Sequence, residues 1–165
     1  MSSLSRNAVL GFIGLTLALH NAEEYFAFPA FLASIGPRLP HWFPATRLTE
    51  VAHHLPIALL LATVLPLIVI GLAAINKRQA LLMAALFVEA ILLVNAFAHV
   101  LTAVLLQSYV PGLITAVLIN LSFGVYVLRR AVGEQWIRVQ VAWQLIAAAI
   151  ALHVIWHSII LWRRA

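Results

Sequence analysis

Residues 80–106 read ALLMAALFVEAILLVNAFAHVLTAVLL, and Glu89 is the one charged residue in this run. About 20 apolar residues suffice to cross the hydrocarbon layer of a bilayer as a helix. The stretch therefore predicts a transmembrane helix. The whole chain agrees, because 64% of its 165 residues are apolar and 9% are charged, whereas a soluble domain is about half apolar and a quarter charged.

Four more segments outside this helix have the length and apolar content of a membrane span. They cover residues 8–33, 55–74, 111–128 and 139–162. Polar or proline-containing stretches separate them, among them Asn76–Arg78 and Gln107–Gly112. The sequence thus predicts an all-α polytopic membrane protein, a single bundle of about five transmembrane helices. We expect residues 1–165 to form one integral membrane domain.

The basic residues lie near the predicted span ends, where they are typical of topology signals at an anionic membrane surface rather than of nucleic-acid binding. Five spans place the two termini on opposite sides of the membrane. We call the N-terminal side A, which receives Arg6, Lys77, Arg78, Arg129, Arg130 and Arg138, and the other side B, which receives Arg38, Arg47, Arg163 and Arg164. This excess predicts that side A and the N-terminus face the cytoplasm.

Three ionisable side chains interrupt the first predicted span. His20, Glu23 and Glu24 stand at i, i+3 and i+4, so they share one helix face. Ionisable groups inside a span are costly and mark functional sites by default. Residues at equal distances in sequence from the turn that joins two antiparallel helices lie at the same depth in the membrane, because each residue adds the same rise. Counted in this way through successive turns, Glu24 lies at the depth of His99, and His20 at the depth of Asn95.

Other polar residues fall at nearby depths. The same counting puts His53 and His54 slightly toward side B, and Ser122 level with Glu24. His153 and His157 lie further toward side B by about 10 Å for an untilted helix, and helix tilt reduces that offset. We therefore expect a polar pocket in the half of the membrane toward side B.

Imidazole and carboxylate groups without thiolates suit zinc, iron or manganese, and the chain has no cysteine. Helical bundles build one- and two-metal sites in this way from facing helices. Glu23 and Glu24 are the candidate catalytic residues. The candidate metal ligands are His20, Glu23, Glu24, His53, His54, His99, His153 and His157. The structural alternative is a hydrogen-bonded knot that holds the helices together.

The pattern His20-Asn21-Ala22-Glu23-Glu24 resembles the HXXEE-motif family of small bacterial integral membrane proteins, residue for residue and near the N-terminus. The length, the hydrophobicity and the later His99 are also similar. The resemblance implies an uncharacterised membrane protein of this type, located in the bacterial inner membrane. It implies no particular reaction.

The residues themselves favour a metal-dependent enzyme, holding zinc or iron, that hydrolyses or oxidises a lipophilic substrate. A carboxylate and an imidazole without metal would instead suit a lipid isomerase. The remaining alternatives are a non-enzymatic metal-binding or transport bundle, and haem ligation by two facing histidines such as His99 and His153. The substrate and the protein partners cannot be read from the residues.

Overall fold

The protein is described here by a computed structural model, which covers the backbone of residues 4–38 and 45–162. The side chains of residues 45–48, 157 and 159–162 lie outside the described part. The predicted metal ligand His157 lies within a helix, and its imidazole falls outside the described side chains. Arg47, Arg163 and Arg164 also fall outside the described side chains.

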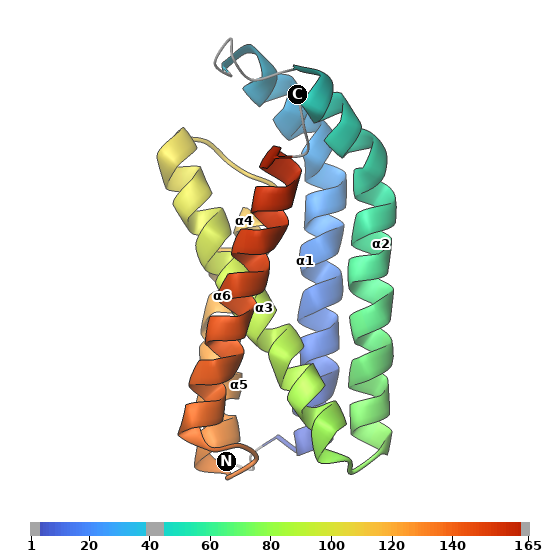
Figure 1. Cartoon of the computed structure of the whole chain (residues 1–165), viewed down its shortest axis with the longest axis vertical. Coiled ribbons are helices and arrows are strands. Elements are labelled where there is room, and N and C mark those ends of the chain that lie inside the picture. The colour runs from blue at the N-terminus through green and yellow to red at the C-terminus, as the bar shows by residue number, and fades with distance from the viewer. Residues whose placement is uncertain (1–3, 39–44, 163–165) are drawn as a thin grey trace.

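Within the described ranges the chain is helical and contains no strand. The elements are α1 (Arg6–Ile35), η1 (Gly36–Arg38), α2 (Ala45–Ile75), α3 (Gln79–Leu106), α4 (Leu113–Thr115), η2 (Ala116–Asn120), α5 (Leu121–Gly133) and α6 (Val139–Trp162). The long helices run alternately up and down, so the start of α1 and the end of α6 lie at opposite ends of the bundle (Figure 1). The all-α bundle predicted from the sequence is confirmed.

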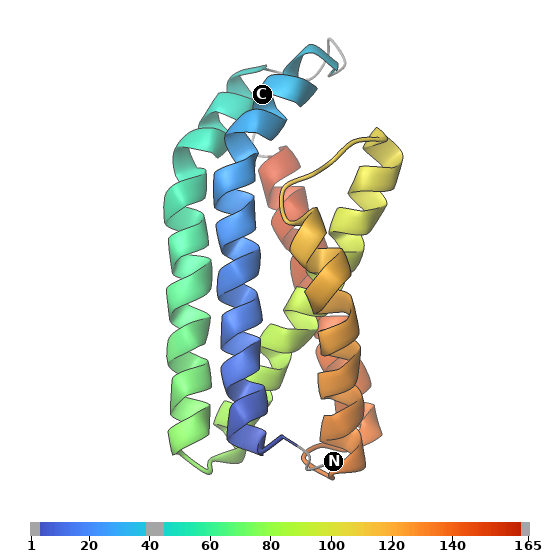
Figure 2. The same ribbon diagram turned by 180° about the vertical axis from the view of Figure 1, so that it is seen from behind.

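Four segments of the described chain are long and apolar enough to cross a membrane: Thr49–Ile75, Gln79–Leu106, Leu113–Gly133 and Val139–Trp156. Large apolar side chains such as Phe26, Ile75 and Leu105 are more than two-thirds exposed, as expected for surfaces that face lipid rather than water. The protein is thus an integral membrane protein. Helix α1 does not meet the same criterion, because the polar residues from His20 to Glu24 lower its mean hydropathy, yet it packs along α2 (Figures 1 and 2).

The fourth predicted span, residues 111–128, is confirmed as the candidate span Leu113–Gly133, but the chain that leads into it is irregular. Helix α3 ends at Leu106, and Gln107 follows in the left-handed conformation with φ 48°. The chain then returns toward the middle of the bundle before α4 begins at Leu113 (Figure 2). The next five residues, Ala116–Asn120, form a π-helix, a wide turn that is found often at functional sites. Non-helical backbone at membrane depth is tolerated where it is buried in protein, and Pro111 and Gly112 are buried.

The tight core of the bundle lies toward side A. It includes Val9 and Ile13 of α1, Leu86 of α3 and Val127 of α5, all fully buried. Because neighbouring helices alternate in direction, residues near the start of α1 and α3 lie at the same end of the bundle as residues near the end of α5. Two cavities are lined by polar residues from the half of the bundle toward side B, and this is where the histidines and Glu24 meet.

Candidate metal centre

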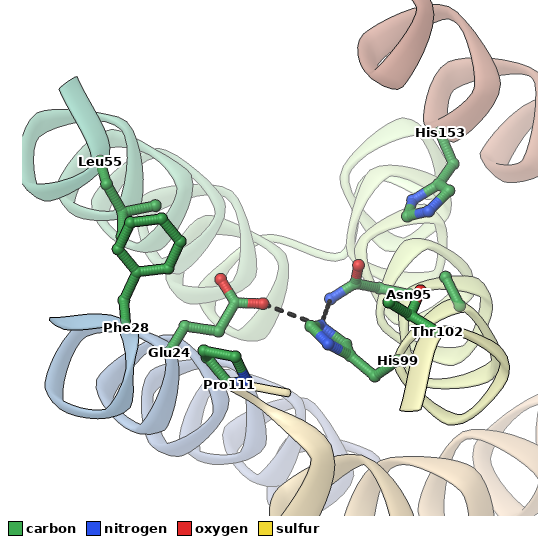
Figure 3. A pocket seen from close by; sticks show the side chains of 9 residues that line it. Glu24, Phe28, Leu55, Asn95, His99, Thr102, Pro111 and His153 are labelled. Atoms are coloured by element: carbon green, nitrogen blue, oxygen red, sulfur yellow. Dashed lines mark hydrogen bonds and ion pairs between the residues drawn. The ribbon is translucent and has the colours of Figure 1, made fainter. Parts of the chain in front are cut away.

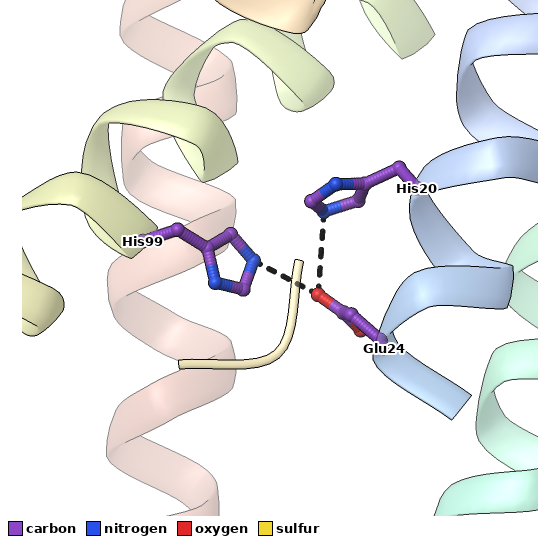
Figure 4. Close-up of side chains that lie close together, drawn as sticks. All are labelled: His20, Glu24 and His99. Carbon is purple, nitrogen blue, oxygen red and sulfur yellow. Dashed lines mark ion pairs between the residues drawn. The ribbon is translucent and has the colours of Figure 1, made fainter. Parts of the chain in front are cut away.

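Helix α1 and helix α3 bring three ligand atoms together. Oε1 of Glu24 lies 2.9 Å from Nε2 of His99 and 3.3 Å from Nε2 of His20 (Figure 4). His20 and Glu24 share a face of α1 because they are four residues apart, whereas His99 reaches them from α3. The predicted depth match between Glu24 and His99 is confirmed. His20 is fully buried, so its ring must find its partners inside the protein.

Asn95 links the two imidazoles. Its amide Nδ2 lies 2.8 Å from Nε2 of His20 and 3.0 Å from Nε2 of His99. An amide nitrogen carries two hydrogens, so it can donate to whichever of these ring nitrogens carries a lone pair, while a ring nitrogen that carries a hydrogen donates to Glu24 instead. Asn95 stands one turn before His99 on α3, so both side chains project into the same space (Figure 3). Its predicted depth match with His20 is also confirmed.

Thr115 fixes the orientation of the His20 ring. Its Oγ1 lies 2.8 Å from Nδ1 of His20 and 2.7 Å from Oε2 of Glu23. A hydroxyl has a single hydrogen, and the carboxylate can only accept it, so Thr115 accepts the hydrogen on Nδ1 of His20. Nε2 of His20 then carries a lone pair that faces Glu24 and His99. Metal-binding histidines are generally oriented in this way by a partner on the other ring nitrogen.

Glu23 is held by four hydrogen bonds and turns away from the other two members of its motif. Its oxygens accept from Tyr109 Oη at 2.7 Å, Ile114 N at 2.9 Å, and Thr115 N and Oγ1 at 2.7 Å each. These donors all lie in residues 109–115, which we call the returning segment because they bring the chain back into the bundle after α3. Glu23 therefore anchors that segment against α1.

Gly112 closes the site from the same segment. Its φ of +86° is a conformation that favours glycine. A Cβ at this position would lie 2.8 Å from Cε1 of His20 and 3.0 Å from Cε1 and Nε2 of His99. The backbone thus approaches both rings as closely as glycine permits, and it fixes their positions.

The group of His20, Glu24 and His99 could hold a metal ion, since ligand atoms from the three residues all lie within 4.8 Å of one another. In a tetrahedral zinc site, ligand atoms that lie about 2.1 Å from the metal are about 3.4 Å from one another. Two histidines and one carboxylate form a common ligand set for zinc and for non-haem iron. Asn95 would present its Oδ1 to such an ion after a half-turn of its amide. The donor chemistry and the spacing both fit a single ion.

The other predicted ligands lie at different distances from this centre. His153 projects from α6 into a cavity of about 220 Å³ that Glu24, Asn95 and His99 also line (Figure 3). Residue counting placed His153 about 10 Å further toward side B than Glu24 for untilted helices. Helix α6 crosses α3 at an angle, and this tilt brings His153 to the same cavity as Glu24 (Figure 3). His54 lines a larger neighbouring pocket.

His53 is exposed, and its ring stacks edge-on against that of His54 at 5.1 Å between centroids. Neither His53 nor His54 belongs to a potential metal-holding group of the described residues. Glu50, which precedes them on α2, is exposed as well. His53 and His54 therefore stand outside the three-residue group, although His54 lines the pocket that adjoins it.

Sequence reasoning missed Tyr109, Gly112 and Thr115. Residue counting placed Ser122 level with Glu24, but the structure places Ile114 and Thr115 beside Glu23 instead. The counting assumed a helical rise of 1.5 Å per residue on both sides of the turn, whereas extended backbone covers about 3.3 Å per residue. The sequence signal nearest to this feature was the Pro111-Gly112 pair.

The fold and the site together define an integral membrane helical bundle with a buried cluster of histidine and glutamate. Residues 12–127 match a family described as "Protein of unknown function with HXXEE motif". The chain belongs to this HXXEE family, and the resemblance noted in the sequence is confirmed. The matched residues include His20, Glu23, Glu24, His99 and Thr115, while α6 with His153 lies beyond them. Comparisons with curated proteins and with solved structures give no match.

Proposed function

We propose that this HXXEE protein is an intramembrane metal-dependent enzyme that hydrolyses or oxidises a lipophilic substrate. The observation that carries the proposal is the convergence of two imidazole nitrogens and one carboxylate oxygen at the wall of a pocket between the helices. Such a cluster is expensive to bury in a bilayer, so a role beyond packing is its simplest physical explanation.

His20, Glu24 and His99 are the proposed ligands, and zinc or iron is the proposed metal. A bound ion of this kind supplies Lewis-acid or redox chemistry to water, oxygen or a substrate carbonyl. Three protein ligands leave further coordination positions open, as catalytic rather than structural sites do. His153 faces the same cavity from α6 and is placed to exchange a proton with a substrate there.

Glu23, a candidate ligand and catalytic residue from the sequence, is here proposed as a positioning residue. Its carboxylate already accepts four hydrogen bonds, which use the lone pairs that a metal would need. It acts on the centre through Thr115, whose hydroxyl orients His20. The described residues form one group that could hold an ion, so we propose one metal rather than two.

A metal-free acid–base enzyme is the second candidate. It is favoured by the 2.9 Å contact between Glu24 Oε1 and His99 Nε2, which is a direct imidazole–carboxylate pair of the kind that transfers protons. This candidate predicts turnover that survives chelators. A lipid isomerase would be its natural reaction class, since proton transfer needs no other co-reactant.

Metal analysis of detergent-purified protein tests the proposal. We expect about one equivalent of zinc or iron in the wild type, and its loss in Glu24→Gln and His99→Ala variants, with His53→Ala as the matched control. Size-exclusion profiles and helical circular dichroism report whether each variant folds. A folded wild type that takes up no metal, or a Glu24→Gln variant that retains all of it, would overturn the proposal.

A further inference from the structure

A second and larger pocket runs alongside the metal centre. It has a volume of about 840 Å³ and draws its lining from α1, α2, α3 and α6. His20, Glu24 and His99 all contribute to its wall, so the pocket and the centre are continuous. This volume is typical of small-molecule sites, and a phospholipid with two acyl chains is larger than most ligands of such sites.

The lining changes from polar to apolar along the pocket. The polar contributors stand toward side B and include Asn95 and His99 on α3. Toward side A the same wall consists of Val88, Ile91 and Leu92 on α3, with Leu65 opposite on α2. The seven residues from Asn95 back to Val88 span about 10 Å of helix. The pocket therefore offers an apolar groove of this length that leads away from the centre.

The depth of the centre restricts the group that can reach it. Helix α3 runs over Gln79–Leu106, so its midpoint falls between Leu92 and Leu93. With that midpoint at the bilayer centre, Asn95 lies about 4 Å and His99 about 10 Å from the midplane, inside a hydrocarbon half-layer of about 15 Å. Tilt brings both residues closer to the midplane. A phosphate or sugar headgroup at this depth would lose its hydration at great cost.

The pocket has a lateral opening, because part of its apolar lining is exposed on the outside of the bundle. Its rim includes Ile57 and Leu61 of α2 and Leu152 and Trp156 of α6, which are all exposed. Exposed apolar side chains on membrane helices face lipid. A molecule dissolved in the bilayer can thus enter between α2 and α6 without leaving the hydrocarbon layer.

From the depth, the polarity gradient and the lateral opening, we infer that the substrate is a neutral lipophile with one apolar chain. Its reacting end would carry a hydroxyl or carbonyl oxygen that meets the His20–Glu24–His99 centre, while its chain lies along Leu65, Val88 and Ile91. Lipids with a charged headgroup would not place that group at the centre. The inference rests on the proposed function, because it assumes that chemistry occurs there.

Photolabelling in lipid nanodiscs tests this assignment. The probe is dodecanol with a diazirine at the chain end, and mass spectrometry locates the labelled residues. We expect labels on Leu65, Val88 and Ile91, and competition by unlabelled dodecanol that exceeds competition by dodecyl-phosphocholine by about tenfold or more. Ala62→Trp fills the groove from α2, and the matched control Ala147→Trp places the same side chain on an exposed part of α6 outside the pocket.

The Ala62→Trp variant should lower labelling by about tenfold or more, and Ala147→Trp should leave it unchanged. Equal labelling in both variants, or equal competition by the two unlabelled amphiphiles, would overturn the inference. Metal content is measured on the same samples. If Ala62→Trp keeps its full metal content and its labelling is unaltered, the substrate assignment alone is wrong. If the wild type contains no metal but is still labelled in the pocket, the proposed function is wrong.

Discussion

Nε2 of His99 lies 2.9 Å from Oε1 of Glu24, although the two residues belong to different helices. This contact joins the named motif of the family to a residue far along the chain. The H and the second E of the motif build the centre with His99, while the first E holds the returning segment in place. The three ionisable residues of the motif therefore have two different structural roles.

Thr115 should control metal affinity without touching the metal. Thr115→Val removes the hydroxyl that accepts from His20 Nδ1 while it conserves side-chain volume. We expect metal affinity to fall by about 10- to 100-fold, as for other groups that orient metal-binding histidines. Competition with a chromogenic chelator measures this affinity. Thr115→Ser restores the hydroxyl and should recover most of the loss, and a Ser variant as weak as the Val variant would contradict the role of the hydroxyl.

Gly112 should tolerate no side chain. In Gly112→Ala the new Cβ would lie 2.8 Å from Cε1 of His20, and alanine also disfavours a φ of +86°. We expect both metal content and thermal stability to fall. Gly11→Ala is the control, because a Cβ at Gly11 meets nothing within 4 Å. If the two alanine variants bind metal equally well, the close approach of residue 112 to the rings is unimportant.

Glu23→Gln should loosen the returning segment. Glutamine has one accepting oxygen in place of two, so at least one donor among Tyr109, Ile114 and Thr115 loses its partner. Hydrogen exchange should accelerate by about tenfold at the amides of Ile114 and Thr115 if about 1.4 kcal/mol of local stability is lost. Glu134→Gln removes a carboxylate bound to Arg130 on the surface and should leave both amides protected. Unchanged exchange in Glu23→Gln would show that another contact holds the segment.

Tyr109 should make stability depend on pH in the alkaline range. Burial and the hydrogen bond to Glu23 raise the pKa of Tyr109 to about 12. Because this folded-state pKa exceeds the ordinary value of about 10, the stabilisation is complete below pH 10 and is lost as the pH rises through 12. Tyrosinate absorbance should show a late transition in the wild type that Tyr109→Phe abolishes. A late transition that persists in Tyr109→Phe would assign it to another group.

Glu89 should be replaceable by an apolar residue. It is fully buried on α3, and among the described residues neither carboxyl oxygen has a hydrogen-bond partner. An unpartnered buried polar group costs about 1–3 kcal/mol, so Glu89→Met should unfold at the same temperature as the wild type or at a higher one. Glu89→Gln keeps the polar atoms and serves as the comparison. A strong loss of stability in Glu89→Met alone would reveal a partner for the carboxyl group.

The sequence by itself predicted the membrane class, the helical bundle and the pairing of His20 and Glu24 with α3. Apolar runs of sufficient length can satisfy their backbone in a bilayer only as helices or closed barrels, so composition decides the class. Short turns such as Asn76–Arg78 fix the relative depth of α2 and α3, because both neighbours rise by the same amount per residue. Depth matching between Glu24 and His99 followed from that regularity.

Only the tertiary structure decided which of the two adjacent glutamates joins the centre and which residues support it. Glu23 and Glu24 differ by about 100° around the helix axis, and the packing of α1 against its neighbours decides which partners each one meets. The segment from Gln107 to Gly112 is not helical, so its reach could not be counted from the sequence, and Thr115 and Gly112 stayed hidden. In a regular helix, residue number determines the depth of each side chain, because every residue adds the same rise. The path of an irregular turn depends instead on the side chains that it contacts.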